Sequence, residues 1–242
     1  MSKKGKSIFK IVKLIIIISA VLGLSYYVVI KSGFFNIKQV VVVNNDYLDP
    51  RDIIKDTGIT GDDNFFLVNL YGPREKLLEN PYVKDVEVRR QFPDKVEITV
   101  YEREEFSSIF IAGTYVIIDE QGRVLRSVDK EVDIMTIKGY NIESYRIGEI
   151  MTSDDAYEFQ RALDLVDLCN QVEALEADEI SYEKGSIFLK LLNGLSVDFG
   201  NGKDIEEKFS KFYAIYEDLV SKGIKKGIIN VSNNGLPTYR PF

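Results

Sequence analysis

The sequence contains no histidine and no tryptophan, and it has a single cysteine, Cys169. Without histidine, the chain cannot build an imidazole-based catalytic triad or any zinc site with a histidine ligand. With one cysteine it cannot form a disulfide within the chain. Composition therefore disfavours enzymes, although a lysine, a serine or a carboxylate can still carry out chemistry.

Charge is missing from one long stretch near the start of the chain. Residues 1–30 hold five lysines and no acid, and no charged residue lies between Lys13 and Lys31. A helix in a soluble core would show a polar face, but here the only hydroxyl side chains before the tyrosine pair Tyr26-Tyr27 are two serines. We predict a transmembrane helix over residues 14–30, near the short end of the length that crosses a bilayer, with the tyrosines at an interface.

A cleaved signal peptide is the competing interpretation of this stretch. Cleavage would need small residues just after the apolar run, whereas residues 26–30 are Tyr-Tyr-Val-Val-Ile. We therefore favour an uncleaved signal anchor, with residues 1–13 as a cytoplasmic tail and the rest of the chain beyond the membrane. The whole chain carries a net charge of −7, so residues 31–242 carry −12, which argues against nucleic-acid binding.

Residues 34–103 show the pattern of a small α+β domain. Alternation of apolar and polar residues predicts strands, and an aspartate before a proline predicts the start of a helix. The expected order is β-α-α-β-β: a strand at 37–43, helices starting near Pro50 and Pro73, and strands at 83–90 and 96–100.

Residues 80–104 carry a specific resemblance. The stretch 80–94 (NPYVKDVEVRRQFPD), then VEITV at 96–100 and Glu102-Arg103-Glu104, is similar to a POTRA domain. One POTRA domain directly after a single membrane helix resembles the FtsQ/DivIB family of bacterial cell division proteins. The family often has tryptophan where this chain has Phe92, so the aromatic character is kept.

Residues 104–242 are expected to form a second domain, which resembles the β domain of that family. The patterns predict hairpins at 115–125 and 186–199, helices at 154–169 and 205–219, and a last strand at 227–232, and they leave 129–152 unassigned. Asn193-Gly194 is typical of a type I′ turn. The tail at 237–242, with two prolines, is not expected to extend a sheet. The predicted fold class is α+β: a transmembrane helix, a POTRA domain and a mixed α/β domain with a curved, mostly antiparallel sheet.

No catalytic, metal or cofactor site is expected from the motifs. Ser-x-x-Lys occurs at Ser7, Ser127 and Ser181, but enzymes of that kind need the serine at a buried helix start, and none of the three fits. Cys169 falls on the apolar face of a predicted helix, where a small core residue is the better interpretation than a reactive thiol. We therefore predict a protein without enzymatic activity.

Partner binding is expected at the last strand, because an extended peptide can add a strand to a sheet edge. From the pattern alone, an interior strand is an equally good interpretation. The family resemblance favours the edge, since it implies that an FtsB-like protein pairs with this strand. An exposed helix end carrying Lys222, Lys225 and Lys226 lies just before it, either simply solvated or attractive to an acidic segment. The predicted contact residues are Ile228, Ile229, Asn230, Val231, Ser232, Asn233 and Tyr239.

The resemblance implies a divisome scaffold at the septum of the cell membrane. Its partners would be membrane-anchored coiled-coil proteins of the FtsB/DivIC and FtsL kinds, with the septal penicillin-binding protein as a further partner. Linking them would help to control septal peptidoglycan synthesis. The alternatives are another single-pass POTRA protein, acting in secretion or envelope assembly, and an anchored hydrolase.

Overall fold

The computed structural model describes residues 3–142, 144–172, 174–233 and 235–242. The chain divides into two compact units, Met1–Glu102 and Arg103–Phe242. Residues 1–2 of the expected cytoplasmic tail, and residue 143 in the stretch left unassigned, lie outside the described residues. The α+β class expected from the sequence is confirmed.

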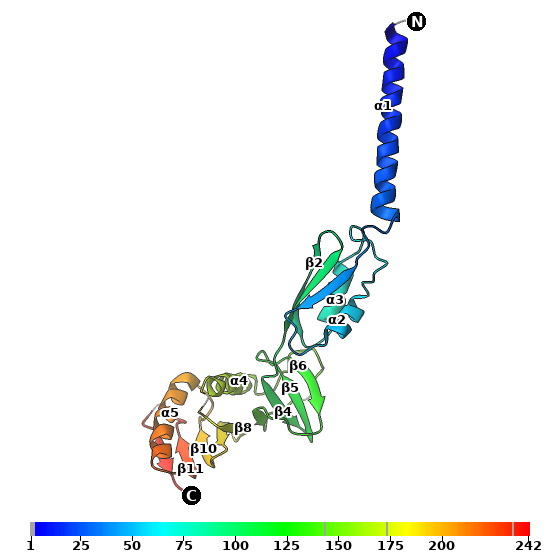
Figure 1. Ribbon diagram of the computed structural model, residues 1–242. Helices are drawn as coiled ribbons and strands as arrows, with labels where there is room; N and C mark the ends of the chain where they lie inside the picture. The colour runs from blue at the N-terminus through cyan, green and yellow to red at the C-terminus, as the bar shows by residue number, and fades with distance from the viewer. Residues whose placement is uncertain (1–2, 143, 173, 234) are drawn as a thin grey trace. The chain divides into compact units, whose positions relative to one another are not determined.

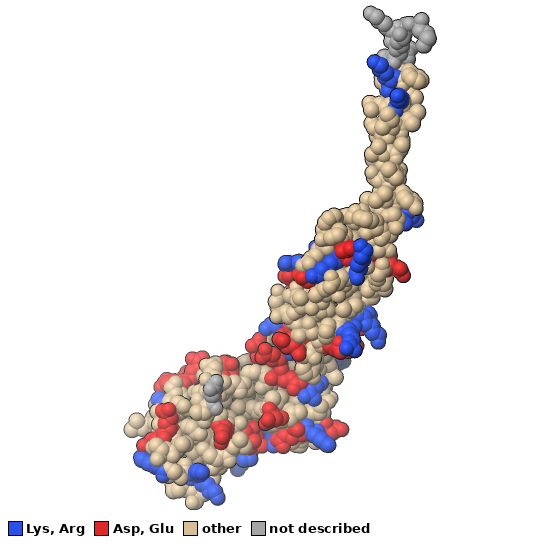
Figure 2. All heavy atoms as spheres, viewed as in Figure 1, with Lys and Arg blue, Asp and Glu red and all other residues tan. Residues whose placement is uncertain are grey.

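The first unit begins with a long apolar helix (Figure 1). Helix α1 spans Lys3–Tyr26 and continues as a π-helical turn, η1, over Tyr27–Lys31. The 23 residues Phe9–Lys31 are long and apolar enough to cross a membrane, and none of them is buried by the rest of the chain. Figure 2 shows this helix free of charge between its lysines. The predicted span, 14–30, therefore lies within one continuous helical segment, which is exposed as far as Val28.

The rest of the first unit is a three-stranded sheet with two helices. In chain order its elements are β1 (Gln39–Val43), α2 (Pro50–Thr57), α3 (Tyr71–Leu78), β2 (Val83–Gln91) and β3 (Lys95–Glu102). The strand order is β1-β3-β2, with β1 parallel and β2 antiparallel to the central β3. The predicted order β-α-α-β-β is confirmed.

Local sequence explains these elements. The Asp49 carboxylate accepts a hydrogen bond from the backbone N–H of Arg51 at the start of α2, and Gly58 ends that helix at φ +67°. The alternating residues Val96, Ile98 and Val100 of β3 are fully buried. The pairing of β2 with β3 shifts register between Val83 and Asp85, so Val83 and Val86, three residues apart, are both buried.

The second unit is a nine-stranded mixed sheet with two helices. The sheet order is β12-β11-β10-β9-β8-β7-β4-β5-β6, antiparallel except at the pairs β11–β10, β8–β7 and β7–β4. Its outermost strands are therefore β12 and β6. Helices α4 and α5 pack together with the sheet into one core. The elements are β4 (Ser107–Ile111), β5 (Thr114–Ile118), β6 (Val124–Val128), β7 (Thr136–Lys138), α4 (Ala156–Asn170), β8 (Ala177–Glu183), β9 (Ser186–Leu191), β10 (Leu195–Asp198), α5 (Ile205–Ser221), β11 (Gly227–Asn230) and β12 (Thr238–Arg240).

Helix α4 of the second unit buries one apolar face, on which the sequence predicts Cys169 to lie. Phe159, Leu163 and Val166 of α4 are buried, and so is Cys169, which is only 3% exposed. Burial raises the pKa of the Cys169 thiol to about 12, so the thiol is protonated at neutral pH. Its predicted role as a small core residue is confirmed.

Several features of the second unit differ from the sequence prediction, among them strands β4 and β8, which no pattern predicted. Strand β7 lies in the stretch left unassigned, and its Ile137 is fully buried between two parallel neighbours, so a three-residue strand showed no readable alternation. The type I′ turn at Asn193-Gly194 is wrong, because only Gly194 has a positive φ, +92°. The N–H of Gly194 donates to the Leu191 carbonyl at 2.9 Å, which closes the turn one residue earlier.

Candidate partner-binding edge of the C-terminal sheet

Strand β11, for which the family resemblance favours an edge position, is paired on both sides. It runs parallel to β10, with Ile229 opposite Val197, and antiparallel to β12, with Ile229 opposite Tyr239. The expectation that the tail cannot extend the sheet is wrong. Proline lacks the N–H that a ladder needs, but Pro237 and Pro241 flank Thr238–Arg240 and leave all three of those N–H groups in place. The outermost strand at this end is therefore β12.

Gly227 makes room for β12. Its φ of +143° favours glycine, and a Cβ at this position would lie 2.5 Å from Cε2 of Tyr239 and 2.7 Å from the Arg240 carbonyl oxygen. The Tyr239 hydroxyl donates to the Lys226 carbonyl at 2.7 Å. The tyrosine ring thus lies across the start of β11, in contact that only glycine permits.

The predicted contact residues come together at this edge, but most of them serve the fold. Ile229 and Val231 are buried, so neither can offer a side chain to a partner. Asn230 donates from Nδ2 to Oδ2 of Asp198 at 2.9 Å, and its Oδ1 accepts from the Ser232 hydroxyl at 2.9 Å. The first contact joins the end of β11 to β10, and the second holds the residues that follow β11.

The accessible residues of this edge are only partly those that the sequence predicts. Ile228, Ser232 and Tyr239 are partly buried, and Asn233 is exposed. Sequence reasoning missed Thr238 and Arg240, which are exposed on β12, and Gly227 beneath the tyrosine ring. The alternating, β-prone triplet Thr-Tyr-Arg was the available signal, and the flanking prolines masked it. We call β11 and β12 together the C-terminal edge.

Positive charge surrounds the C-terminal edge, although residues 31–242 as a whole are acidic. Lys225, Lys226 and Arg240 are exposed. Lys222 forms an ion pair with Asp218, four residues earlier on α5, at 2.6 Å. Because Lys222 already has a carboxylate partner, the other three cations are the ones placed to attract an acidic segment.

A buried lysine lies at the far end of β10. Lys208 on α5 is 3% exposed, and its Nζ donates to the Phe199 carbonyl at 3.0 Å. Burial lowers the pKa of Lys208, and the nearby Asp204 and Asp198 act in the opposite direction. This hydrogen bond ties α5 to the residue that directly follows β10.

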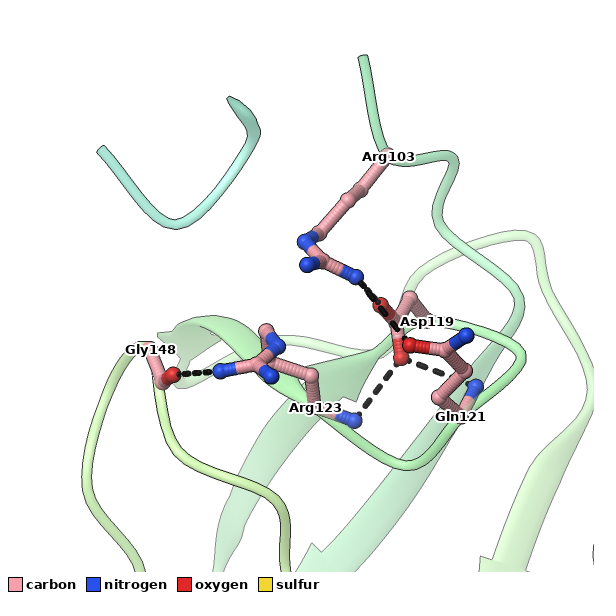
Figure 3. Close-up of polar contacts among 5 residues, drawn as sticks. All are labelled: Arg103, Asp119, Gln121, Arg123 and Gly148. Atoms are coloured by element: carbon pink, nitrogen blue, oxygen red, sulfur yellow. Dashed lines mark hydrogen bonds and ion pairs between the residues drawn. The ribbon is translucent and has the colours of Figure 1, made fainter. Parts of the chain in front are cut away.

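The chain enters the second unit through a buried ion pair (Figure 3). Nη1 of Arg103 lies 2.7 Å from Oδ2 of Asp119, and Oδ1 of Asp119 accepts from the backbone N–H groups of Gln121 at 2.9 Å and Arg123 at 2.8 Å. The Arg123 guanidinium donates to the Gly148 carbonyl. Asp119 directly follows β5, and through these hydrogen bonds it organises the turn that leads to β6.

The residue before Arg103 ties the chain to the first unit. The Glu102 carboxylate accepts hydrogen bonds from three successive backbone N–H groups, those of Asp46, Tyr47 and Leu48, at 3.0, 2.7 and 2.9 Å. Adjacent residues thus anchor the chain within each unit, which gives the Glu102-Arg103-Glu104 motif a physical role.

None of the serine motifs lies at a buried helix start. Ser127 is exposed on β6, Ser181 lies on β8, and Ser7 lies within α1. Over the described ranges there is no group of three or more histidine, cysteine, aspartate or glutamate residues placed to hold a metal. The absence of enzymatic activity stays a prediction from the sequence.

The fold defines a class of protein in which an apolar N-terminal helix precedes one POTRA domain and a larger sheet domain. Two family models match the chain: "POTRA domain, FtsQ-type" over residues 35–103, and "Cell division protein FtsQ/DivIB, C-terminal" over residues 110–232. The chain belongs to the FtsQ/DivIB family of cell division proteins, as the resemblance implied. Strand β12 lies beyond the second matched range.

Curated relatives agree over most of the chain. A cell division protein DivIB of Clostridium tetani is 27% identical over 86% of this chain and 80% of its own length, and one of Clostridium botulinum is 26% identical over 98% and 93%. A solved extracytoplasmic domain of DivIB from Geobacillus stearothermophilus is 16% identical over 43% of this chain and 82% of that chain, with a TM-score of 0.28. Family membership rests on the family models and not on that structure.

Proposed function

We propose that this cell division protein is a non-enzymatic scaffold of the divisome, anchored in the cell membrane by α1. The lysine-rich start of the chain would stay in the cytoplasm, and both folded units would lie on the other side, at the division septum. A helix with an uncharged run at 14–30 and no buried residue in its apolar window supports the anchor, and family membership supports the location at the septum.

The proposed binding surface is the C-terminal edge, to which a partner adds an extended strand. The observation that carries this proposal is that β12 ends the sheet, with one side paired to β11. An outermost strand presents unpaired backbone N–H and C=O groups, which give a partner strand its hydrogen bonds. Tyr239 and Asn233 would lie nearest the partner, and Ile228 to Ser232 would act through the strand that supports β12.

The proposed partners are membrane-anchored coiled-coil division proteins of the FtsB/DivIC and FtsL kinds. Anchorage in one membrane raises the effective concentration of each protein near the others, so a short interface suffices. A septal penicillin-binding protein would join through the same assembly, which would let the scaffold influence septal peptidoglycan synthesis. The exposed cations Lys225, Lys226 and Arg240 favour an acidic segment next to the pairing strand.

Removing β12 tests this proposal. The full-length chain and a chain ending at Leu236 are each co-expressed with the FtsB/DivIC-like partner, and recovery of the partner with the scaffold is measured. We expect the shortened chain to lose the partner, because the pairing strand is gone. Ser127→Pro, a backbone lesion on the outermost strand at the other end of the sheet, is the matched control and should retain it.

Equal or greater recovery with the shortened chain would contradict pairing on β12. It would instead mean that the partner takes the place of β12 on β11. Loss of the partner in both variants would point to a fold that depends on both edges, and circular dichroism of each variant checks this.

A further inference from the structure

The first unit exposes a cluster of aromatic and apolar side chains at the end where the chain leaves α1. Three segments that are far apart in sequence contribute to the cluster. Exposed fractions are 64% for Phe34, 46% for Phe66, 63% for Leu67 and 73% for Phe92. We call these four residues together with Phe35 the aromatic base.

The rings of the aromatic base contact one another. Phe35 is at the centre, with ring centroids 4.9 Å from Phe34, 5.1 Å from Phe66 and 6.3 Å from Phe92. Only Phe65, 5% exposed, turns inward, and it meets Phe66 at 5.2 Å. Contiguous exposed apolar surface of this kind marks an interaction site in a soluble domain.

The backbone beneath these rings is tied down. The N–H of Phe65 donates to the Phe35 carbonyl at 2.8 Å, and that of Ile37 donates to the Asp63 carbonyl at 2.9 Å. Nε of Arg90 donates to the Phe65 carbonyl at 2.8 Å, and its Nη2 bonds the Val68 carbonyl. The rings are therefore exposed from a fixed framework.

The aromatic base lies next to the end of the proposed membrane helix. Lys31 ends the helix, and Phe34 follows three residues later. The side-chain Nδ2 of Asn64 donates to the Val29 carbonyl of η1 at 2.6 Å. The uncharged run 14–30 is about 26 Å long as a helix, less than the roughly 30 Å of a hydrocarbon core. Because Phe34 follows Lys31 so closely, the aromatic base lies near the interface, where aromatic and leucine side chains are favoured.

We propose that the aromatic base rests in the headgroup region of the phospholipid bilayer that α1 crosses. This inference depends on the proposed function, because it needs α1 to span the membrane. The lipid would bury the rings of three segments at once and so limit the tilt of the POTRA domain on its anchor.

Tryptophan fluorescence tests the inference, since the chain has no tryptophan of its own. Full-length chains carrying Phe92→Trp, Tyr47→Trp or Leu22→Trp are reconstituted in vesicles of phosphatidylcholine and phosphatidylglycerol, with bromine placed high or low on the acyl chains. Tyr47 is the matched control: its side chain is 60% exposed, and its N–H bonds Glu102, at the opposite end of the same sheet. Leu22 lies within the proposed span and reports on anchorage.

We expect Phe92→Trp to lose most of its emission to the high bromines and to emit at shorter wavelength than Tyr47→Trp. Tyr47→Trp should keep its emission, and Leu22→Trp should be quenched best by the low bromines. Circular dichroism and a second reporter, Phe66→Trp, guard against an unfolded variant.

Each contrary result has a distinct meaning. Quenching at position 22 without quenching at positions 92 and 66 would overturn the lipid contact, leave the anchor intact and assign the aromatic base to a protein partner absent from the vesicles. Equal quenching at 47 and 92 would overturn the proposal by showing a domain lying flat on the bilayer. Absence of quenching at 22 would overturn the anchor and the inference together.

Discussion

The aromatic base exposes side chains, whereas the C-terminal edge exposes backbone groups. At the base, large side chains reach solvent while the Phe35 and Phe65 carbonyls accept hydrogen bonds within the unit. At the edge, Ile229 and Val231 are buried, and it is the backbone of β12 that ends the ladder. Contact through apolar side chains has no preferred direction, so it suits a fluid lipid surface. Backbone hydrogen bonds between strands are directional, so they suit one partner strand in one register.

This contrast predicts different sensitivities in the two regions. The base should tolerate exchange of one exposed apolar side chain for another, because no fixed geometry is required of the lipid. The edge should tolerate exchange of exposed side chains but not changes that move the backbone. The four changes below test this difference in order of decreasing effect.

The largest effect is expected inside the first unit, at the one ring beneath the base that is buried. Phe65→Ala should lower the free energy of unfolding of this unit by about 3–5 kcal/mol, because it leaves a cavity. Phe92→Ala, at an exposed ring of the same cluster, should change it by less than about 1 kcal/mol. Urea titration measures both, and equal losses would mean that the exposed rings serve the fold.

The next effect is expected at the entrance to the second unit. Asp119→Asn removes the buried charge that pairs with the partly buried Arg103, so we expect a loss of about 3 kcal/mol. Hydrogen exchange should show faster opening of β4 to β6 and unchanged protection in β1 to β3. If protection fell in both units, the base and the edge could not be treated as independent.

A smaller effect is expected at the C-terminal edge itself. Gly227→Ala brings a methyl group into Tyr239 and an unfavourable φ, so we expect a loss of about 1–3 kcal/mol and release of β12. Gly235→Ala is the control in the same tail, since a Cβ there would meet no atom within 4 Å. Hydrogen exchange of residues 238–240 reports the release, and unchanged exchange would show that β12 adapts to the methyl group.

The smallest effect is a change in pH dependence. Because burial lowers the pKa of Lys208 below its usual 10.5, the unfolded chain binds this proton more tightly than the folded one. Deprotonation of this group therefore increases the free energy of unfolding as pH rises from the pKa of the folded state toward 10.5. Lys208→Met should lack that gain, measured as the difference between the two urea titration series from pH 7 to 10. Parallel curves would mean that the lysine is not desolvated.

Much of the architecture follows from the sequence. The uncharged run 14–30, the Asp49-Pro50 helix start and the alternation of Val96, Ile98 and Val100 are local signals, and each predicted an element that the structure contains. Local signals suffice there because propensity, capping and burial all favour the same conformation. The family resemblance added the order of the domains.

Tertiary structure alone decided the two candidate surfaces. Strand β12 is three residues long and exists because Gly227 admits the Tyr239 ring, a contact between residues twelve apart. The aromatic base joins residues near 35, 66 and 92, whose exposure depends on how the sheet folds. In both cases non-local packing sets which groups remain free, because a side chain or a ladder is available only when no distant segment covers it.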